Sequence, residues 1–500
     1  MQQRIMAIDQ GTSSSRAMVF ELGGDRDADQ AVRVLGVGQE PFDMIFPAGG
    51  WVEQDPEVLW RTTLAAARAA LAAAGLTASD VAAIGITNQR ETTLVWDRRT
   101  GQCVHNAIVW QDRRTAGRCE GMRADGIEDV VARQTGLVID PYFSATKLAW
   151  LLDEIPGVRE RALRGELCFG TVDSFLVWRL TGGRVHATDA TNAGRTQLFD
   201  IGRQRWSDEL LRYFRVPESL LPDVRDSAGD FGVAEAKWLG AEIPVLGVAG
   251  DQHAAVVGQG CFEPGMSKST FGTGCFALAN TGERQLASRH RLLTTVAYRV
   301  RGTTTYALEG SIFSAGVAVK WLRDRLGLID AAAETEAAAI RTGGDTGGVY
   351  LVPAFTGLGA PHWNPDARGI LVGLTLDTGR DQIVTATLGS VAYQAQELLA
   401  AMAADGAPVE RLRVDGGMVV NDWLCQFLAD ILACRVERPV ITETTALGAA
   451  VLAALGAGIV SDLSEAGRLW HLERAFLPTM AEERRGQLLA GWRRAVARAL

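Results

Sequence analysis

The 500-residue chain is too long for one hydrophobic core, so the sequence predicts two large domains. An apolar share of 47% and a charged share of 22% are ordinary for a globular protein, and a net charge of −9 without a basic cluster argues against nucleic acid as a partner. The seven cysteines lack paired spacing, and neither a secretory signal nor a bilayer-spanning stretch is visible, so we expect a cytoplasmic protein without membrane insertion.

The first predicted element is a hairpin over residues 5–20, in which two apolar runs flank a polar turn. The backbone N–H of Gly11 and the hydroxyl groups of residues 12–15 are suited to an oxyanion, which Arg16 would neutralise. Asp9, at the end of the first strand, is placed to hold a hard cation that bridges phosphate oxygens. No Lys-Ser/Thr follows the glycine and a strand follows the turn, which excludes the Walker and dinucleotide loops. Alone, the stretch is equally compatible with a polar hairpin tip.

A helix is predicted from an N-cap at Asp55 to a stop at Gly75. Residues 81–86 then predict a buried strand, and the loop after it presents Arg90 and Glu91. Ligands of α/β sheets usually bind at the ends of such strands. A surface ion pair is the alternative interpretation of these two residues.

The next elements alternate between strand and helix. Residues 107–110 predict a short strand ending at Trp110, which either lines a pocket or lies in the core, the commoner place for an aromatic side chain. A helix follows Ser144 and ends before Pro156, and residues 167–172 and 173–180 predict a further strand and helix.

Scattered charges, glycines and prolines at residues 221–240 indicate a domain boundary. We place it between residues 248 and 249, which gives domains 1–248 and 249–500. The apolar strand at residues 244–249 runs into Asp251. An aspartate there serves as a general base or a metal ligand, or else as the N-cap of the following helix.

The second half repeats the hairpin pattern. Residues 267–279 predict two strands around Gly272-Thr273-Gly274, which indicates a duplicated architecture. A strand at residues 412–415 leads through a double-glycine turn into a helix at 421–432; the turn either admits a flat ligand or is an ordinary loop. Residues 445–457 predict a helix of small residues that packs closely on a sheet. The alternation throughout predicts the α/β class.

Three of these motifs, in this order, resemble the phosphate and adenosine motifs of the actin-like ATPase superfamily; they are Asp-Gln-Gly-Thr at 9–12, Gly-Thr-Gly at 272–274 and Asp-Gly-Gly at 415–417. Within it, the chain resembles the FGGY carbohydrate kinases, especially members that act on glycerol. The stretches that carry this closer resemblance are residues 84–93, 110–114, 136–144, 249–252, 271–276 and 352–361. The resemblance covers nearly the whole chain and implies two ribonuclease-H-like domains that flank a catalytic cleft.

The resemblance also implies a reaction and its residues. The reaction is ATP-dependent phosphorylation of glycerol to sn-glycerol 3-phosphate with Mg²⁺, in which Asp251 is the catalytic base and Asp9 the metal ligand. The implied glycerol-binding residues are Arg90, Glu91, Trp110, Tyr142, Asp251, Gln252 and Phe276. The implied nucleotide-binding residues are Thr12, Ser13, Ser14, Arg16, Thr273, Gly316, Lys320, Gly417 and Asn421. Lys320 departs from the family pattern, because relatives of the enteric type carry glutamine there, and His253 is expected behind the site.

Two other functions stay open at this point. The first is the same chemistry on another small polyol or ketose, such as erythritol or xylulose. The second is an actin-like, nucleotide-switched filament protein, which shares the three nucleotide motifs but has no need of Arg90-Glu91 together with Asp251-Gln252. The resemblance implies a homodimer or a homotetramer without choosing between them.

Overall fold

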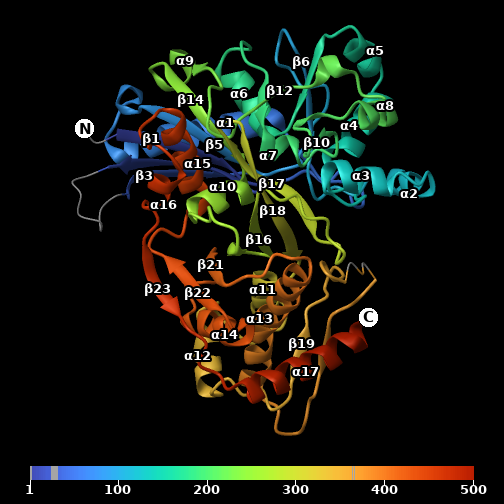
Figure 1. Cartoon of the computed structure of the whole chain (residues 1–500), viewed down its shortest axis with the longest axis vertical. Helices are drawn as coiled ribbons and strands as arrows, with labels where there is room; N and C mark the ends of the chain where they lie inside the picture. The colour runs from blue at the N-terminus through green and yellow to red at the C-terminus, as the bar shows by residue number, and fades with distance from the viewer. Residues whose placement is uncertain (1–2, 24–31, 363, 365) are drawn as a thin grey trace.

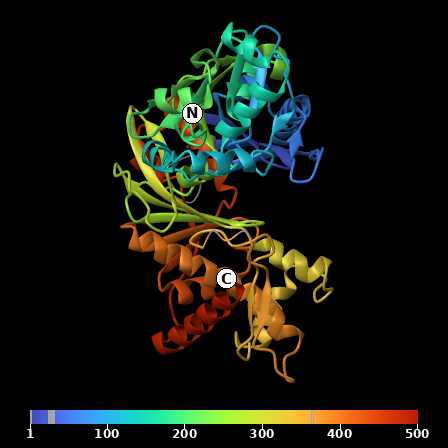
Figure 2. The ribbon, with the colours of Figure 1, turned by 90° about the vertical axis from the view of Figure 1, so that its right-hand side faces the viewer.

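A computed structural model describes residues 3–23, 32–362, 364 and 366–500. Two domains lie one above the other along the long axis of the molecule (Figures 1 and 2). The first domain is built on a six-stranded sheet in the order β13-β14-β5-β1-β2-β3. Its strands are β1 (Gln3–Gln10), β2 (Ser14–Leu22), β3 (Val32–Pro41), β5 (Ala83–Asn88), β13 (Val233–Ala234) and β14 (Ile243–Gly250).

The second domain is built on a seven-stranded sheet in the order β17-β18-β16-β15-β21-β22-β23. Its strands are β15 (Met266–Phe271), β16 (Cys275–Gly282), β17 (Leu293–Val300), β18 (Thr303–Ile312), β21 (Arg411–Asp415), β22 (Arg435–Pro439) and β23 (Leu472–Phe476).

The two sheets share one topology, which confirms the predicted duplication. In each, an antiparallel hairpin, β1–β2 or β15–β16, is extended by a third antiparallel strand, β3 or β18. The first hairpin strand also pairs in parallel with β5 or β21, which in turn pairs in parallel with β14 or β22. This is the ribonuclease-H-like arrangement of the actin-like ATPase fold, and the α/β class is confirmed with it.

The first long helix has the predicted start and stop. Helix α1 (Pro56–Ala74) begins after the N-cap Asp55, whose side chain accepts from the N–H of Glu57, and ends at Gly75 in the left-handed conformation. It lies against β3, where a Cβ on Gly36 would fall 2.3 Å from the carbonyl oxygen of Ala70. Only glycine permits that close approach of helix to strand.

Further short elements complete the first domain. Its short strands are β4 (Glu53–Gln54), β6 (Leu94–Asp97), β7 (Ala107–Ile108), β8 (Leu167–Gly170), β9 (Ala187–Asp189), β10 (Phe199–Asp200), β11 (Arg205–Trp206) and β12 (Asp223–Arg225). Its helices are α2 (Ala116–Ala124), α3 (Glu128–Thr135), α4 (Ser144–Glu154), α5 (Val158–Leu163), α6 (Val172–Leu180), α7 (Ala190–Ala193), α8 (Asp208–Phe214), α9 (Ala236–Leu239) and α10 (Asp251–Gly258), with 3₁₀ turns at Ala78–Asp80 and Glu218–Leu220. The strand predicted at 107–110 stops at Ile108, so Trp110 lies beyond it.

The helices of the second domain pack on its sheet, and the apolar core of the domain lies between them and the sheet. They are α11 (Gly316–Asp324), α12 (Glu334–Arg341), α13 (Arg380–Ala404), α14 (Asp422–Leu432) and α17 (Glu482–Ala499), beside the short strands β19 (Tyr350–Val352) and β20 (Ile370–Val372). The short helix α16 (Leu463–Gly467) instead packs with α10 and α15 (Thr444–Gly456), because its Ala466 belongs to their buried cluster. Of the helices in the part of the chain described, none is long and apolar enough to cross a bilayer.

Helix α15 (Thr444–Gly456) comes late in the chain but packs on the first sheet, against β14, β5 and β1 (Figure 1). It also crosses α10, and a Cβ on Gly448 would lie 1.8 Å from the carbonyl oxygen of Ala254. The predicted close packing of a small-residue helix on a sheet is confirmed. The division between residues 248 and 249 falls within β14 and stays a prediction.

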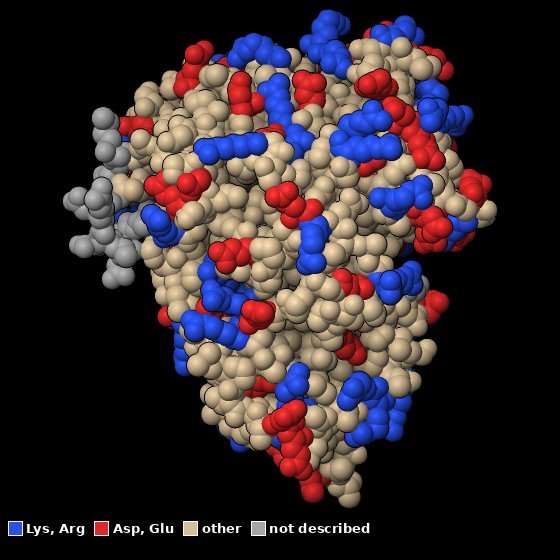
Figure 3. All heavy atoms as spheres, in the orientation of Figure 1, with Lys and Arg blue, Asp and Glu red and all other residues tan. Residues whose placement is uncertain are grey.

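Charges of both signs are interspersed on the face of the molecule seen in Figure 3.

Between the domains, β17 contacts α7, so the edge of the second sheet reaches the first domain. The candidate site lies where these two parts meet.

Candidate active site

The β1–β2 turn has the geometry expected of a small oxyanion loop. The N–H of Gly11 donates to the carbonyl oxygen of Ser14 at 3.0 Å, which closes the turn and leaves Ser13 exposed. The expectation that all four hydroxyl residues face one ligand is wrong for Ser15. Its side chain is fully buried, with Oγ 2.9 Å from Oγ1 of Thr62. Successive side chains of a strand point to opposite faces, so Ser14 and Ser15 diverge.

Two predicted phosphate-site residues lie beside this turn. The Arg16 guanidinium pairs with the carboxylate of Glu443, which precedes α15, and donates to Oε1 of Gln39 at 3.1 Å. Burial raises the pKa of Asp9 to about 7; Arg16 opposes that rise, while Asp251 and Glu443 add to it. Asp9 and Asp251, far apart in sequence, are therefore close enough for their charges to interact.

The parallel strands β5 and β14 bring Arg90 and Asp251 together. The two strands are neighbours and end side by side, with Asn88 opposite Gly250. Arg90 follows β5 and Asp251 follows β14, and Nε of Arg90 lies 3.2 Å from Oδ1 of Asp251. Asp251 is not the N-cap of α10, because Gly250 occupies that position. Its side chain keeps 32% of its surface exposed, so it is free to meet a ligand.

Aromatic side chains lie beside the Arg90 guanidinium. Trp110 and Tyr142 meet edge to face with ring centroids 5.5 Å apart, and Nη2 of Arg90 lies 3.4 Å from the Tyr142 hydroxyl, to which it donates. The guanidinium carbon also lies 5.8 Å from the centroid of the Phe276 ring. Trp110 is half-buried, and its Nε1 donates to Oγ1 of Thr12 at 2.9 Å. This indole therefore joins the polar pocket to the phosphate turn.

Polar residues that the sequence reasoning missed lie behind this pocket. Lys268 is fully buried on β15, and its ammonium group donates to Oε1 of Gln252 and, at 3.0 Å, to Oγ1 of Thr270. Arg195, just after α7, and Glu309, on β18, are buried against Arg90 and Glu91. One signal was available in the sequence, because Lys268 and Glu309 are charged residues inside otherwise uncharged strand segments.

His253 lies behind Asp251, as expected. It is fully buried, and its Nε2 lies 3.1 Å from Oγ1 of Thr295. Burial and the neighbouring Arg90 charge hold the pKa of His253 well below its ordinary value, so the ring is neutral at physiological pH.

Two of the three predicted nucleotide motifs, residues 272–274 and 415–417, adjoin each other in the second domain. The carbonyl oxygen of Thr273 accepts the N–H of Val317 at 3.0 Å, and that of Gly272 accepts the N–H of Gly316 at 2.9 Å. A Cβ on Gly416 would lie 2.5 Å from the carbonyl oxygen of Phe271, so the double-glycine turn lies directly against the hairpin.

Four other nucleotide candidates differ in their surroundings. Thr273 and Gly417 are exposed, with open space where a Gly417 side chain would be. Asn421 is the N-cap of α14, since its Oδ1 accepts from the N–H of Leu424 at 2.8 Å. Lys320 is exposed on α11, one turn after Gly316.

Within the described ranges, no three His, Cys, Asp or Glu side chains are grouped to hold a metal ion. A cation at Asp9 would therefore need oxygen ligands from a bound phosphate group, which is how Mg²⁺ is usually held. Burial keeps Asp9 partly protonated near neutral pH, and a bound cation would relieve that cost. The residues present fit Mg²⁺ on these grounds.

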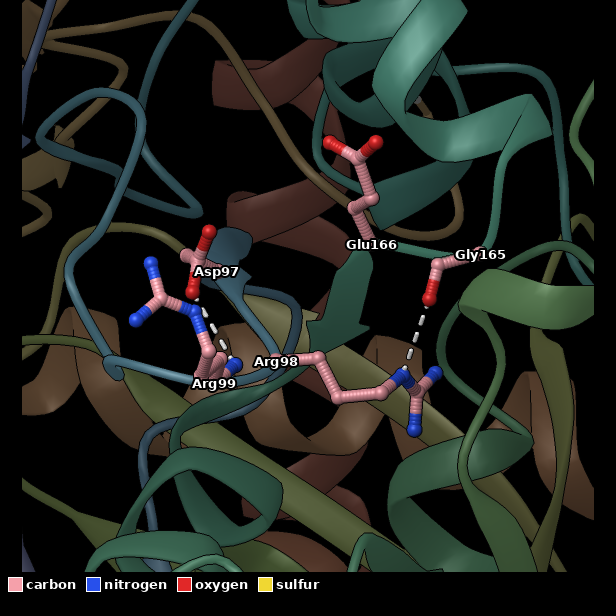
Figure 4. Close-up of a pocket in the computed structure, with 5 residues that line it drawn as sticks. All are labelled: Asp97, Arg98, Arg99, Gly165 and Glu166. Atoms are coloured by element: carbon pink, nitrogen blue, oxygen red, sulfur yellow. Dashed lines mark hydrogen bonds between the residues drawn. The ribbon is translucent and has the colours of Figure 1, made fainter.

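A surface cavity of about 420 Å³ lies elsewhere on the first domain, between the end of β6 and the start of β8 (Figure 4). Its polar groups already bond one another, since Nε of Arg98 donates to the carbonyl oxygen of Gly165 at 3.2 Å and the N–H of Arg99 donates to Oδ1 of Asp97 at 3.0 Å. None of the candidate residues lines it.

Comparison with known proteins gives consistent matches over the whole chain. Residues 4–258 match the N-terminal domain and residues 268–457 the C-terminal domain of the FGGY family of carbohydrate kinases. Glycerol kinase 1 of Pseudomonas aeruginosa is 61% identical over 100% of this chain and 99% of the relative, and the glycerol kinase of Rhodospirillum centenum is 60% identical over 99% and 97%. The crystal structure of Plasmodium falciparum glycerol kinase with ADP is similar with a TM-score of 0.91 at 34% identity, over 100% of this chain and 98% of that one.

Proposed function

Because the chain belongs to the FGGY family of carbohydrate kinases, we propose that it transfers the γ-phosphoryl group of ATP to glycerol and forms sn-glycerol 3-phosphate. The observation that carries this proposal is the contact of Arg90 with Asp251, at the joint end of β5 and β14 and beside the phosphate turn. The names of the relatives that match over full length support glycerol as the acceptor.

The acceptor pocket has the chemistry that a small triol requires. Hydroxyl groups need polar partners, which Arg90, Glu91, Asp251 and Gln252 supply, while the carbon chain needs an apolar wall. We propose that Trp110, Tyr142 and Phe276 form that wall, since Tyr142 and Phe276 contact the Arg90 guanidinium and Trp110 packs on Tyr142. A site that pairs each hydroxyl discriminates strongly against an analogue lacking one, because its polar groups are then left unpaired.

In the mechanism that we propose, Asp251 takes the proton from a terminal hydroxyl of glycerol. The oxygen then attacks the γ-phosphorus, the bond to the bridging oxygen of ADP breaks, and the proton stays on the carboxyl group until it is lost to solvent. Nε of Arg90 lies 3.2 Å from Oδ1 of Asp251 and orients that carboxylate. Mg²⁺, held by Asp9 and the phosphate groups, would neutralise charge on the triphosphate.

The nucleotide would lie between the two hairpins. We propose that the turn residues and Arg16 bind its phosphate groups, and that the second domain binds the remainder. The proposed contacts are Thr12, Ser13, Ser14 and Arg16 on the first domain, and Thr273, Gly316, Lys320, Gly417 and Asn421 on the second.

The Arg16–Glu443 pair gives a testable prediction. The Glu443 carboxylate pairs with the Arg16 guanidinium, which we propose binds the phosphate groups of ATP. The substitution Glu443→Gln removes this competing ion pair and also removes a negative charge beside an anionic ligand. Exposed ion pairs contribute up to about 1 kcal/mol, so we expect the KM for ATP to fall roughly two- to fivefold, with the KM for glycerol unchanged. Initial rates at varied ATP measure this.

Glu473→Gln is the matched control, because Glu473 is a similarly exposed carboxylate that pairs with Arg438 at 2.6 Å outside the site. It is expected to leave both KM values as they are. A higher KM for ATP in Glu443→Gln would contradict the prediction and indicate that Glu443 helps to hold the nucleotide or its metal ion.

The function itself is tested by coupled ADP release with glycerol, erythritol and xylulose offered separately. We expect the highest kcat/KM with glycerol and negligible ATP turnover without an acceptor. A preference for one of the other two would assign the same chemistry to a different substrate. ATP turnover without an acceptor, together with sedimenting polymers, would favour the filament protein.

We also propose a cytoplasmic location and a homodimer or homotetramer. All seven cysteines are free, and burial raises the pKa of Cys261 and Cys275 to about 12, which suits inert thiols in a reducing compartment. Cell fractionation and sedimentation velocity test these two proposals.

A further inference from the structure

Glu309 of the second domain is the acceptor for two arginines of the first domain. Its Oε2 lies 2.7 Å from Nη1 of Arg90, and its Oε1 lies 2.9 Å from Nη2 of the same guanidinium. Arg195 approaches from another side, with Nη1 3.2 Å from Oε2 and Nη2 3.3 Å from Oε1. The four N–H donors fill the four lone-pair positions of this carboxylate.

Arg195 also extends the contact to the acceptor site. Its Nε donates to Oε1 of Glu91 at 2.6 Å, while its two terminal nitrogens stay on Glu309. Glu91 itself is held with a positive φ of 42°, an uncommon conformation for a residue with a side chain. The chain of contacts therefore runs from Asp251 through Arg90, Glu309 and Arg195 to Glu91.

The charges in this chain depend on one another because they are buried. The exposed fractions of Arg195, Glu309 and Glu91 are 0%, 1% and 1%. Burial alone would raise the pKa of Glu309, but Arg195 and Arg90 outweigh it and hold that pKa below its ordinary value. Burial likewise raises the pKa of Glu91, against the opposing charges of Arg195 and Arg90. The two guanidiniums repel each other, and Glu309 is the carboxylate that both of them share, while Glu91 and Asp251 supply further negative charge.

We propose that Glu309 and Arg195 are positioning residues for the acceptor site, through which strand β18 of the second domain fixes the Arg90 and Glu91 side chains that hold the acceptor hydroxyls. This inference rests on the proposed function. Glu309 directs both terminal nitrogens of Arg90 toward itself, which turns Nε toward Asp251. The pocket is then complete only while β18 contacts the first domain.

Removing the Glu309 charge separates this role from a merely structural one. In Glu309→Gln, the amide offers one acceptor oxygen to two guanidiniums, and Arg90 is expected to turn toward the remaining carboxylates of Asp251 and Glu91. A positioning role predicts a higher KM for glycerol and a lower kcat, with an unchanged KM for ATP. A structural role alone would reduce the folded fraction, which lowers the apparent kcat and leaves both KM values unchanged.

Glu437→Gln is the matched control. Glu437 is also a buried carboxylate on a strand of the second sheet, and it pairs with Arg435 at 2.6 Å and with Arg413 at 3.4 Å. Its partners do not include residues of the acceptor pocket. Glu309→Gln and Glu437→Gln therefore each remove one buried carboxylate that accepts hydrogen bonds from arginines. Of these two carboxylates, only Glu309 contacts Arg90.

The experiment compares initial rates of wild type, Glu309→Gln and Glu437→Gln with glycerol and ATP varied in turn, beside thermal unfolding of each. We expect Glu309→Gln to lose about a hundredfold in kcat/KM for glycerol, the scale set by misplacing catalytic groups by about 1 Å. A wild-type KM for glycerol in Glu309→Gln, or an equal rise in Glu437→Gln, would overturn the inference.

Arg195→Lys carries the same test if Glu309→Gln does not fold. One ammonium group reaches Glu309 or Glu91 but cannot make the fork to both, so the KM for glycerol should again rise while that for ATP stays. An unchanged KM for glycerol in this variant would overturn the inference too. A wild-type enzyme without activity on glycerol would instead contradict the proposed function, so the two failures are distinguishable.

Discussion

Asp251→Asn is expected to lower kcat by about 10²–10⁴, the usual contribution of a general base, while the KM for ATP stays near the wild-type value. An amide cannot accept the hydroxyl proton, but it has the size of the carboxylate and leaves the backbone of α10 in place. The side chain also keeps an oxygen for Arg90, whose Nε lies 3.2 Å away. The loss should therefore appear in turnover with glycerol saturating.

Asp208→Asn is a suitable control, because Asp208 is the first residue of α8 as Asp251 is of α10. It is expected to leave kcat unchanged. Pre-steady-state measurement of phosphorylated product separates chemistry from ADP release. Full activity of Asp251→Asn would exclude Asp251 as the base.

Gly448→Ala is expected to destabilise the protein by at least about 3 kcal/mol, the upper range for overpacking of a core. The added Cβ would lie 1.8 Å from the carbonyl oxygen of Ala254, so α15 and α10 must separate. Because α10 carries Asp251 at its start, we also expect the remaining folded protein to lose activity. Urea unfolding and initial rates measure the two effects.

Gly486→Ala is the matched control for this substitution. Gly486 lies in the interior of α17, and nothing lies within 4 Å of its added Cβ. Alanine favours a helix over glycine by about 1 kcal/mol, so this variant should be slightly more stable and fully active. A Gly448→Ala protein with the wild-type unfolding midpoint would show that the two helices are not in close contact.

Local sequence patterns predicted most of the fold. The buried runs of β1 and β14, the two glycine hairpins and the caps of α1 all depend on neighbours in the chain, which periodicity and turn residues reveal. The sheet against which α15 packs could not be predicted in this way. That choice depends on glycines of distant segments, such as Gly85, whose added Cβ would lie 2.0 Å from the carbonyl oxygen of Ala449.

In the candidate site, too, some residues could be predicted from the sequence, while partners from distant segments could not. Arg90, Asp251, Trp110 and Tyr142, expected together from the resemblance, do lie together. Partners supplied from far along the chain were missed, since nothing local to Glu309 names its two arginines. Its position as a charged residue inside an otherwise uncharged strand segment was nevertheless a usable signal, because a charge buried in a strand needs a partner.

A crystal structure with glycerol and an unreactive ATP analogue tests the central claim most directly. The account predicts the terminal phosphate between the turn at residues 11–16 and Asp251, with a terminal hydroxyl of glycerol within hydrogen-bond distance of that carboxylate. A nucleotide bound away from this turn, or a glycerol whose hydroxyl groups lie out of reach of Asp251, would contradict it.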